Sequence, residues 1–141
     1  MSRDTIRATV LVASAAMLQV VLWQANRWLG FHVHGYVQGA PIPEWYMTLD
    51  PPFWSLITVA PAFIVGWFAP RHGVALGVLA TSLATVTNRG FATARGVWDW
   101  SPWFLSDAVA LWHLFISVLA VAILGVVSAA AGAYFRSKHE A

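Results

Sequence analysis

The stretch that decides the fold is residues 107–135, DAVALWHLFISVLAVAILGVVSAAAGAYF, in which the only formally charged side chain is Asp107 at its start. It exceeds the roughly 20 apolar residues that a helix needs to cross a bilayer. The 141-residue chain is 59% hydrophobic and 10% charged, and its mean hydropathy is +0.65. Soluble domains carry about 25% charged residues. Because so few charges cannot cover a soluble core, the sequence predicts an integral membrane protein.

Upstream of this stretch, three further apolar segments predict membrane-spanning helices, at about residues 6–29, 53–69 and 73–88. Only PRHG, residues 70–73, separates the second segment from the third, so the two form an antiparallel hairpin. The first continues well past ASA, residues 13–15, which favours a retained span over a cleaved signal peptide. The expected fold is an all-α bundle of four transmembrane helices in one domain, 1–141, with outer loops at about 30–52 and 89–106.

The basic residues predict the orientation of this bundle. With four spans, both termini and the PRHG turn share one side of the membrane. The positive-inside rule places the side with more Lys and Arg in the cytoplasm. Five basic residues fall on the side of the termini and three on the other: Arg3, Arg7, Arg71, Arg136 and Lys138 against Arg27, Arg89 and Arg95. We therefore expect a protein of the plasma (inner) membrane with both termini cytoplasmic.

Tryptophan gathers at the predicted outer face. Eight of the nine tryptophans lie at or beyond that boundary: Trp23, Trp28, Trp45, Trp54, Trp98, Trp100, Trp103 and Trp112. Indoles prefer the membrane interface, so loops lying flat on it would explain the pattern. An aromatic pocket for a quinone, tetrapyrrole or carotenoid, centred on Trp98, Trp100, Trp103 and Trp112, is a second explanation. Contact with a partner subunit is a third, because tryptophan dominates interface hot spots.

Part of the first outer loop resembles a known family. In EWYMTLDPPFW, residues 44–54, the residues Trp45, Tyr46, Leu49, Pro52 and Trp54 resemble the WYxxLxKPxW segment of the tryptophan-rich sensory proteins (TspO). The resemblance covers about ten residues and implies an aromatic pocket for a porphyrin or a sterol. The chain lacks that family's lysine, its later Asn- and Trp-bearing helix and a fifth span, so we do not assign it to the family.

Histidines supply the candidate metal or haem ligands. His32 and His34 lie in RWLGFHVHGY, residues 27–36, and their aromatic and glycine neighbours favour an extended segment that would point both imidazoles to one face. His113, near the outer end of the fourth span, could complete a site for a transition metal or haem. The alternatives are a plain loop exit for the pair and a helix-to-helix hydrogen bond for His113.

Small residues at four-residue spacing predict close helix packing, since they let backbones approach one another in lipid. The spans contain Gly73 and Gly77, and then Gly125, Ala129 and Gly132. No Asp, Glu, Lys or Arg lies deep in a span, which disfavours a small ion-coupled transporter.

The leading functional hypothesis is a non-catalytic accessory, structural or assembly subunit whose Trp-rich outer face contacts lipid or a larger complex. No phosphate-binding loop, HExxH motif or nucleophile elbow indicates an enzyme, and no basic cluster indicates nucleic acid. The alternative is a haem-, metal- or quinone-binding protein. A homo-oligomer formed through the small-residue faces is also compatible with the sequence.

Overall fold

The computed structural model describes residues 3–33, 44–69, 71–91 and 102–140; the side chains of residues 29–33, 44–52, 103 and 104 lie outside this description. Within these ranges the chain is helical and contains no strand. Its elements are α1 (Arg3–Val33), α2 (Glu44–Phe68), α3 (Gly73–Gly90), the 3₁₀ turn η1 (Trp103–Ser106) and α4 (Ala108–His139). Two helices are long and apolar enough to cross a membrane, over Arg3–Trp28 and Ala108–His139, whereas Phe53–Phe68 is a shorter apolar stretch.

Two helices extend into the segment that the sequence assigned to the first outer loop. α1 continues to Val33, so the residues up to Val33 are helical rather than extended. α2 begins at Glu44 and runs through Pro51 and Pro52, where the sequence suggested a start near residue 53. Proline removes one helical hydrogen bond but does not stop a helix whose other residues are supported by packing. The connection between the two helices is correspondingly shorter than expected.

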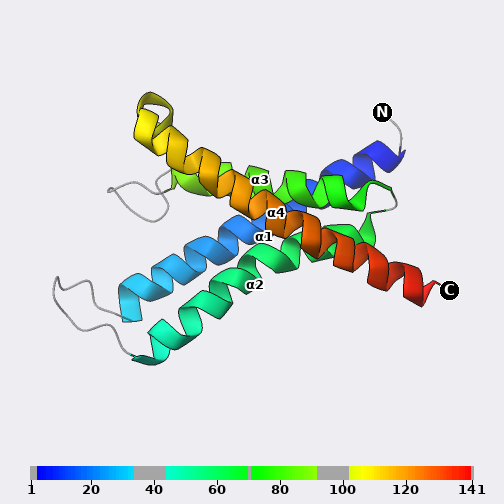
Figure 1. Ribbon diagram of the computed structural model, residues 1–141, viewed down its shortest axis with the longest axis horizontal. Helices are drawn as coiled ribbons and strands as arrows, with labels where there is room; N and C mark the ends of the chain where they lie inside the picture. Colours follow the sequence, from blue (N-terminus) through cyan, green and yellow to red (C-terminus); the bar gives the residue numbers. More distant parts are fainter. Residues whose placement is uncertain (1–2, 34–43, 70, 92–101, 141) are drawn as a thin grey trace.

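The α2–α3 hairpin lies at the centre of the bundle. α1 and α4 each pack against both hairpin helices, and in the described part of the chain they make no contact with one another. α4 crosses in front of α1 in Figure 1, and the start of α1 and the end of α4 lie at the same end of the molecule. The connection between α2 and α3 lies at that end too, which we call the terminal end; the opposite end is the loop end.

α2 and α4 pack backbone to backbone. A Cβ atom added to Gly66 of α2 would overlap the main chain of Ala129 on α4, and one added to Gly132 would overlap the carbonyl group of Phe63. Ala129 itself is fully buried. Since main-chain atoms cannot move aside as a flexible side chain can, glycine is required at both crossing points.

α3 approaches α4 almost as closely. A Cβ added to Gly77 would lie 2.6 Å from the Cβ of Ala129, and one added to Gly125 would lie 2.8 Å from Oγ1 of Thr81. Within the hairpin, a Cβ on Gly73 would lie 3.1 Å from the carbonyl oxygen of Gly66. The three helices α2, α3 and α4 therefore meet around Ala129, and small residues set the distance between them.

α1 packs on the other side of the hairpin with somewhat larger side chains. One apolar cluster joins it to both hairpin helices, and a second joins it to α3; their buried members are Val12, Ala15, Val65, Ala69 and Ala80, and then Ala16, Val20 and Ala84. Towards the loop end the indole of Trp23 packs on that of Trp54, with ring centroids 5.3 Å apart. Trp23 is the bulkiest buried side chain on α1.

An arginine from each outer helix hydrogen-bonds to a hairpin helix where that helix ends. Nη1 of Arg27 on α1 donates to the carbonyl oxygen of Phe91, at the end of α3, over 2.9 Å. Nη1 of Arg136 on α4 donates to the carbonyl oxygen of Ala69, at the end of α2. Unpaired carbonyls and the helix dipole make such ends favourable for a cation. The two contacts lie at opposite ends of the bundle and hold α1 and α4 in register with the hairpin.

The starts of α3 and α4 are formed by local hydrogen bonds. His72 adopts a left-handed conformation with φ 55°, and its carbonyl accepts the amide of Leu76 over 3.0 Å. Asp107 caps α4, because its Oδ1 accepts the amides of Val109 and Ala110 over 2.8 Å and 3.2 Å. The aspartate at the edge of the most apolar stretch therefore fixes where that helix begins.

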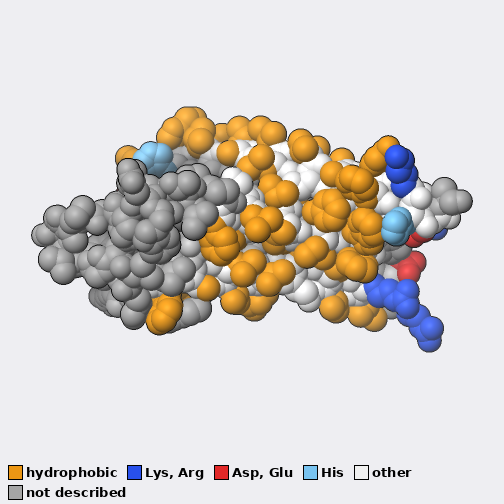
Figure 2. All heavy atoms as spheres, turned by 90° about the horizontal axis from the view of Figure 1, so that it is seen from below, with side chains coloured by type: hydrophobic (Ala, Val, Ile, Leu, Met, Phe, Trp, Pro, Cys, Tyr) orange, Lys and Arg blue, Asp and Glu red, His pale blue; other side chains and the backbone are white. Residues whose placement is uncertain are grey.

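The surface seen in Figure 2 is apolar along the bundle and charged at the terminal end. Hydrophobic side chains cover the middle of this face, while Lys and Arg side chains gather where α1 begins and α4 ends. Large apolar residues are exposed on all four helices, and most numerous on α4. This is the surface expected of a bundle that lipid or another protein surrounds.

Candidate functional site

The described residues do not bring the predicted histidine ligands together. His113 lies exposed on the second turn of α4, and its backbone carbonyl accepts the hydroxyl of Ser117 over 2.7 Å. His32 belongs to the last turn of α1, with its side chain outside the description, and His34 lies outside the described residues altogether. Over their described residues, α1 and α4 make no contact with one another. No group of three potential metal ligands occurs among the described residues.

Only one tryptophan of the predicted aromatic pocket has a described side chain. Trp112 is 61% exposed on α4 and stacks on Phe115 with ring centroids 5.7 Å apart. Trp103 lies in η1 with its side chain outside the description, and Trp98 and Trp100 lie outside the described residues. Trp112 therefore forms part of an apolar helix surface, and the pocket stays a prediction.

Two fully buried amides lie on α1, and one of them bonds to an amide of α3. Gln19 and Gln24 are fully buried. Nε2 of Gln24 donates to Oδ1 of Asn88 on α3, which joins the two helices. Both polar atoms of Gln19 lack a hydrogen-bond partner, as do Oε1 of Gln24 and Nε1 of Trp23. We call Gln19, Trp23, Gln24 and Asn88 the amide cluster.

The amide cluster presents unused donors and acceptors in apolar surroundings. Gln19 and Trp23 are four residues apart on α1 and therefore lie one above the other on the same helix face. An unpaired amide in such a place costs about 1–3 kcal/mol, so groups like these normally find water or a ligand. Its unpaired atoms are two donors, Nε2 of Gln19 and Nε1 of Trp23, and two acceptors, Oε1 of Gln19 and Oε1 of Gln24. The sequence signal was the spacing of Gln19, Trp23 and Gln24 within an otherwise apolar helix.

Part of α4 is exposed in the part of the chain that the structure describes. Between Ala110 and Gly125, which are buried, every residue is exposed or only half-buried. This uncovered segment, residues 111–124, covers about four helical turns at 3.6 residues per turn. α4 thus packs through its second half and presents most of its first half to the surroundings.

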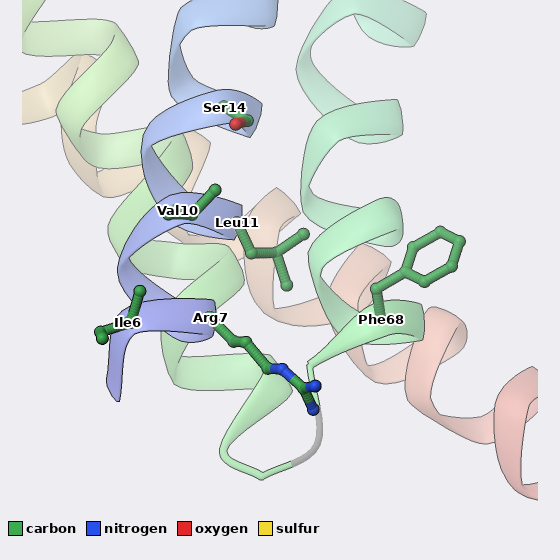
Figure 3. Close-up of a pocket in the computed structure, with 6 residues that line it drawn as sticks. All are labelled: Ile6, Arg7, Val10, Leu11, Ser14 and Phe68. Atoms are coloured by element: carbon green, nitrogen blue, oxygen red, sulfur yellow. The ribbon is translucent and has the colours of Figure 1, made fainter. Parts of the chain in front are cut away.

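An open groove lies at the terminal end between the first turns of α1 and the end of α2 (Figure 3). Its volume is about 480 Å³. Five of the six lining residues belong to α1, and Phe68 closes the side formed by α2. The lining residues are Ile6, Arg7, Val10, Leu11, Ser14 and Phe68. We call this the terminal groove.

Comparison with known proteins adds no family. No protein-family model matches the sequence, and no curated protein or solved structure matches it either. The resemblance to the tryptophan-rich sensory proteins therefore stays confined to the short segment around residues 45–54. Function has to be argued from the bundle itself.

Proposed function

We propose that this chain is a small non-catalytic membrane protein, an accessory or assembly subunit that joins a larger membrane complex through α4. The uncovered segment 111–124 carries the proposal, because a four-turn apolar stretch without one buried residue needs a cover from outside the chain. Lipid tails cover such a surface without specificity. The distribution of the exposed residues in this segment favours a partner helix over lipid as the cover.

Two neighbouring stripes of the uncovered segment differ in size and polarity. Each follows the four-three-four spacing at which a helix meets another helix. One stripe contains two small residues, Ser117 and Ala120, which allow close approach of a second backbone. The other contains only bulky apolar residues, which suit lipid. The first is His113, Ser117, Ala120 and Leu124, and the second is Trp112, Ile116, Leu119 and Ile123.

A matched pair of substitutions tests this proposal. The tagged protein is extracted in mild detergent and its assembly size is measured by native electrophoresis and light scattering. We expect Ala120→Trp to reduce the assembly to the mass of a single chain, because the indole separates the helices, and Leu119→Trp to leave the assembly intact. An unchanged assembly in both variants would remove α4 as the contact.

The absence of cysteine allows a second readout. The chain contains none, so Ala120→Cys provides a unique thiol for cross-linking in the native membrane. The adduct then identifies the neighbour, whether a second copy or another subunit. A Leu119→Cys chain reports the background, because its thiol would face lipid. Equal cross-linking of the two thiols would contradict the assignment of the stripes.

The proposed topology has four spans with both termini in the cytoplasm. The basic residues of the terminal end support this orientation through the positive-inside rule. α3, with 18 residues, is about 27 Å long and approaches the thickness of a hydrocarbon core. Reporter fusions at each terminus and in the α2–α3 connection test this topology, because all three reporters should lie in the cytoplasm. A periplasmic signal from either terminus would overturn the orientation.

A second candidate function is the binding of a quinone or a similar carbonyl-bearing ligand, and the amide cluster favours it. Donors on Gln19 and Trp23 suit a carbonyl oxygen, and the surrounding apolar residues suit a ring and tail. Solvent extraction of the purified protein tests for a bound quinone. An absorbance spectrum and metal analysis of the same sample test for haem or a metal at His32, His34 and His113. A stoichiometric quinone that disappears in Gln19→Leu but remains in Met17→Leu would establish this candidate. An empty extract would reject it.

A further inference from the structure

The terminal groove is apolar along its length and basic at its mouth. Ile6, Val10 and Ser14 follow one another at four-residue spacing, so they line a path of about 12 Å along α1. Leu11 also lines the groove and extends from α1 towards α2, while Phe68 lines it from α2 with its ring directed away from α1, as Figure 3 shows. A second apolar hollow of about 270 Å³ extends along α2 from the shared Phe68. The two hollows share Phe68, and their mainly apolar linings suit a chain of methylene groups.

Arg7 is the basic group at this mouth. Its side chain extends from α1 towards the end of α2 in Figure 3. Arg27 and Arg136 both donate to helix-end carbonyls. By contrast, among the described residues the guanidinium of Arg7 has no hydrogen-bond or ion-pair partner, and Arg7 is exposed. A guanidinium beside an apolar groove suits a phosphate, which it binds through two parallel N–H groups.

The charges around the groove favour an anion. Among the described residues, five basic side chains and two acidic ones lie at the terminal end: Arg3, Arg7, Arg71, Arg136 and Lys138 against Asp4 and Glu140. Glu140 lies 4.0 Å from Nε of Arg136, so it acts mainly on the α4 side. Asp4 lies one turn before Arg7 on α1 and offsets part of the positive charge there, but the basic residues remain in excess at this end, which attracts anionic headgroups more than zwitterionic ones.

We propose that the terminal groove binds one anionic phospholipid from the leaflet at the terminal end, with its phosphate on Arg7 and an acyl chain along Ile6, Val10 and Phe68. The proposal rests on the membrane insertion proposed above. Such a site would select lipids by their headgroup. A plain apolar surface, by contrast, would bind all lipids alike.

Native mass spectrometry of the delipidated protein in mild detergent tests the site, with phosphatidylglycerol and phosphatidylcholine of identical acyl chains as probes. We expect a preference of about fivefold for phosphatidylglycerol, the contribution of one basic residue near a membrane surface. Arg7→Gln should abolish this preference. Lys138→Gln removes the same charge from the same end but outside the groove, and it should keep the preference. Ser14→Trp fills the groove and should weaken binding of both lipids together.

Two outcomes would overturn the lipid site. The first is a wild-type protein without preference between the two lipids. The second is an equal loss in Arg7→Gln and Lys138→Gln, which would assign the effect to the net charge of the terminal end. Extraction of the native membrane at alkaline pH shows whether the chain is inserted in the membrane, independently of whether the lipid site exists. A chain retained in the membrane but without lipid preference would refute the site alone, whereas a chain released by alkali would refute both.

Discussion

α4 and α1 pack on the same central hairpin by different chemistry. On the α4 side, Gly66 and Gly132 bring main chains into direct contact, and Ala129 fills the space between three helices. On the α1 side, contact is made by small apolar clusters, an indole pair and the amide cluster, four of whose buried polar atoms lack partners. The comparison separates an interface optimised for close packing from one that keeps unused hydrogen-bonding capacity.

The difference between the two interfaces indicates which of them could bind a ligand. Buried polar groups without hydrogen-bond partners reduce the stability of the fold. Groups of this kind are typical of functional sites, where binding compensates for the lost stability. The α4 interface leaves no room for a guest, whereas the α1 interface offers donors and acceptors to one. Four experiments test the comparison, and they are taken in order of expected effect.

The largest effect is expected from Gly66→Ala. The added methyl group would overlap the main chain of Ala129, and neither helix can move aside without losing its other contacts. We expect a loss of about 3 kcal/mol in the free energy of unfolding, at the upper end for overpacking. Unfolding in mixed SDS and mild detergent, followed by circular dichroism, measures it. Gly125→Ala is the comparison variant, because there the methyl group meets Oγ1 of Thr81 at 2.8 Å and not main-chain atoms, so a smaller loss is expected. Equal losses would show that α4 does not depend on backbone contact.

Breaking either of the two arginine contacts should lower the free energy of unfolding by about the same amount, although one contact belongs to the α1 interface and the other to the α4 interface. Arg136→Gln and Arg27→Gln each remove a charge-assisted hydrogen bond to a helix-end carbonyl, so each should lower the free energy of unfolding by about 1.5–2 kcal/mol. The same unfolding assay applies, with Lys138→Gln as a control for loss of charge. A much larger loss for one arginine would show that its helix relies on that contact alone.

Gln19→Leu should act in the opposite direction. It replaces a fully buried amide without partners by an apolar group of similar size, so we expect the ligand-free protein to gain about 1 kcal/mol of stability. Met17→Leu, at a position that is 65% exposed, should change nothing. A loss of stability in Gln19→Leu would mean that the amide is satisfied by bound water or a ligand, and the α1 interface would then resemble the α4 interface in being fully paired.

The smallest effect is expected from the hydrogen bond between Gln24 and Asn88. A double-mutant cycle with Gln24→Ala and Asn88→Ala should give a coupling energy of about 0.6 kcal/mol, the average for helix-to-helix hydrogen bonds in membranes. Gln24 keeps one unpaired oxygen, so even the paired amide is only half satisfied. A coupling energy above about 1.7 kcal/mol would make the amide cluster a principal source of stability.

The sequence predicts the helices well where composition alone decides them. The stretch 107–135 corresponds to α4, because an uninterrupted apolar run has no other stable conformation in lipid and Asp107 marks its start. The ends of α1 and α2 are less predictable. The proline pair at 51 and 52 suggests a boundary, yet α2 continues through both, which residue propensity alone does not predict.

The candidate sites are harder to predict because they depend on which helices touch. Joining His113 to His32 assumed that α1 and α4 are neighbours, and helix order around the bundle cannot be read from spacing. The polar spacing of Gln19, Trp23 and Gln24 was visible, but the lack of hydrogen-bond partners appears only once α3 is placed beside them. Arg7 likewise becomes distinctive only when other arginines are seen to be engaged.

The separation of α1 from α4 has a consequence for how the protein is made. α1, α2 and α3 precede α4 in the chain, and none of the contacts among these three requires it. During translation the first three helices can therefore associate into a preformed platform while the last is still being synthesised. α4 then docks on a finished surface, as a separate polypeptide could. A gene divided between α3 and α4 would encode two fragments able to reassemble within one cell.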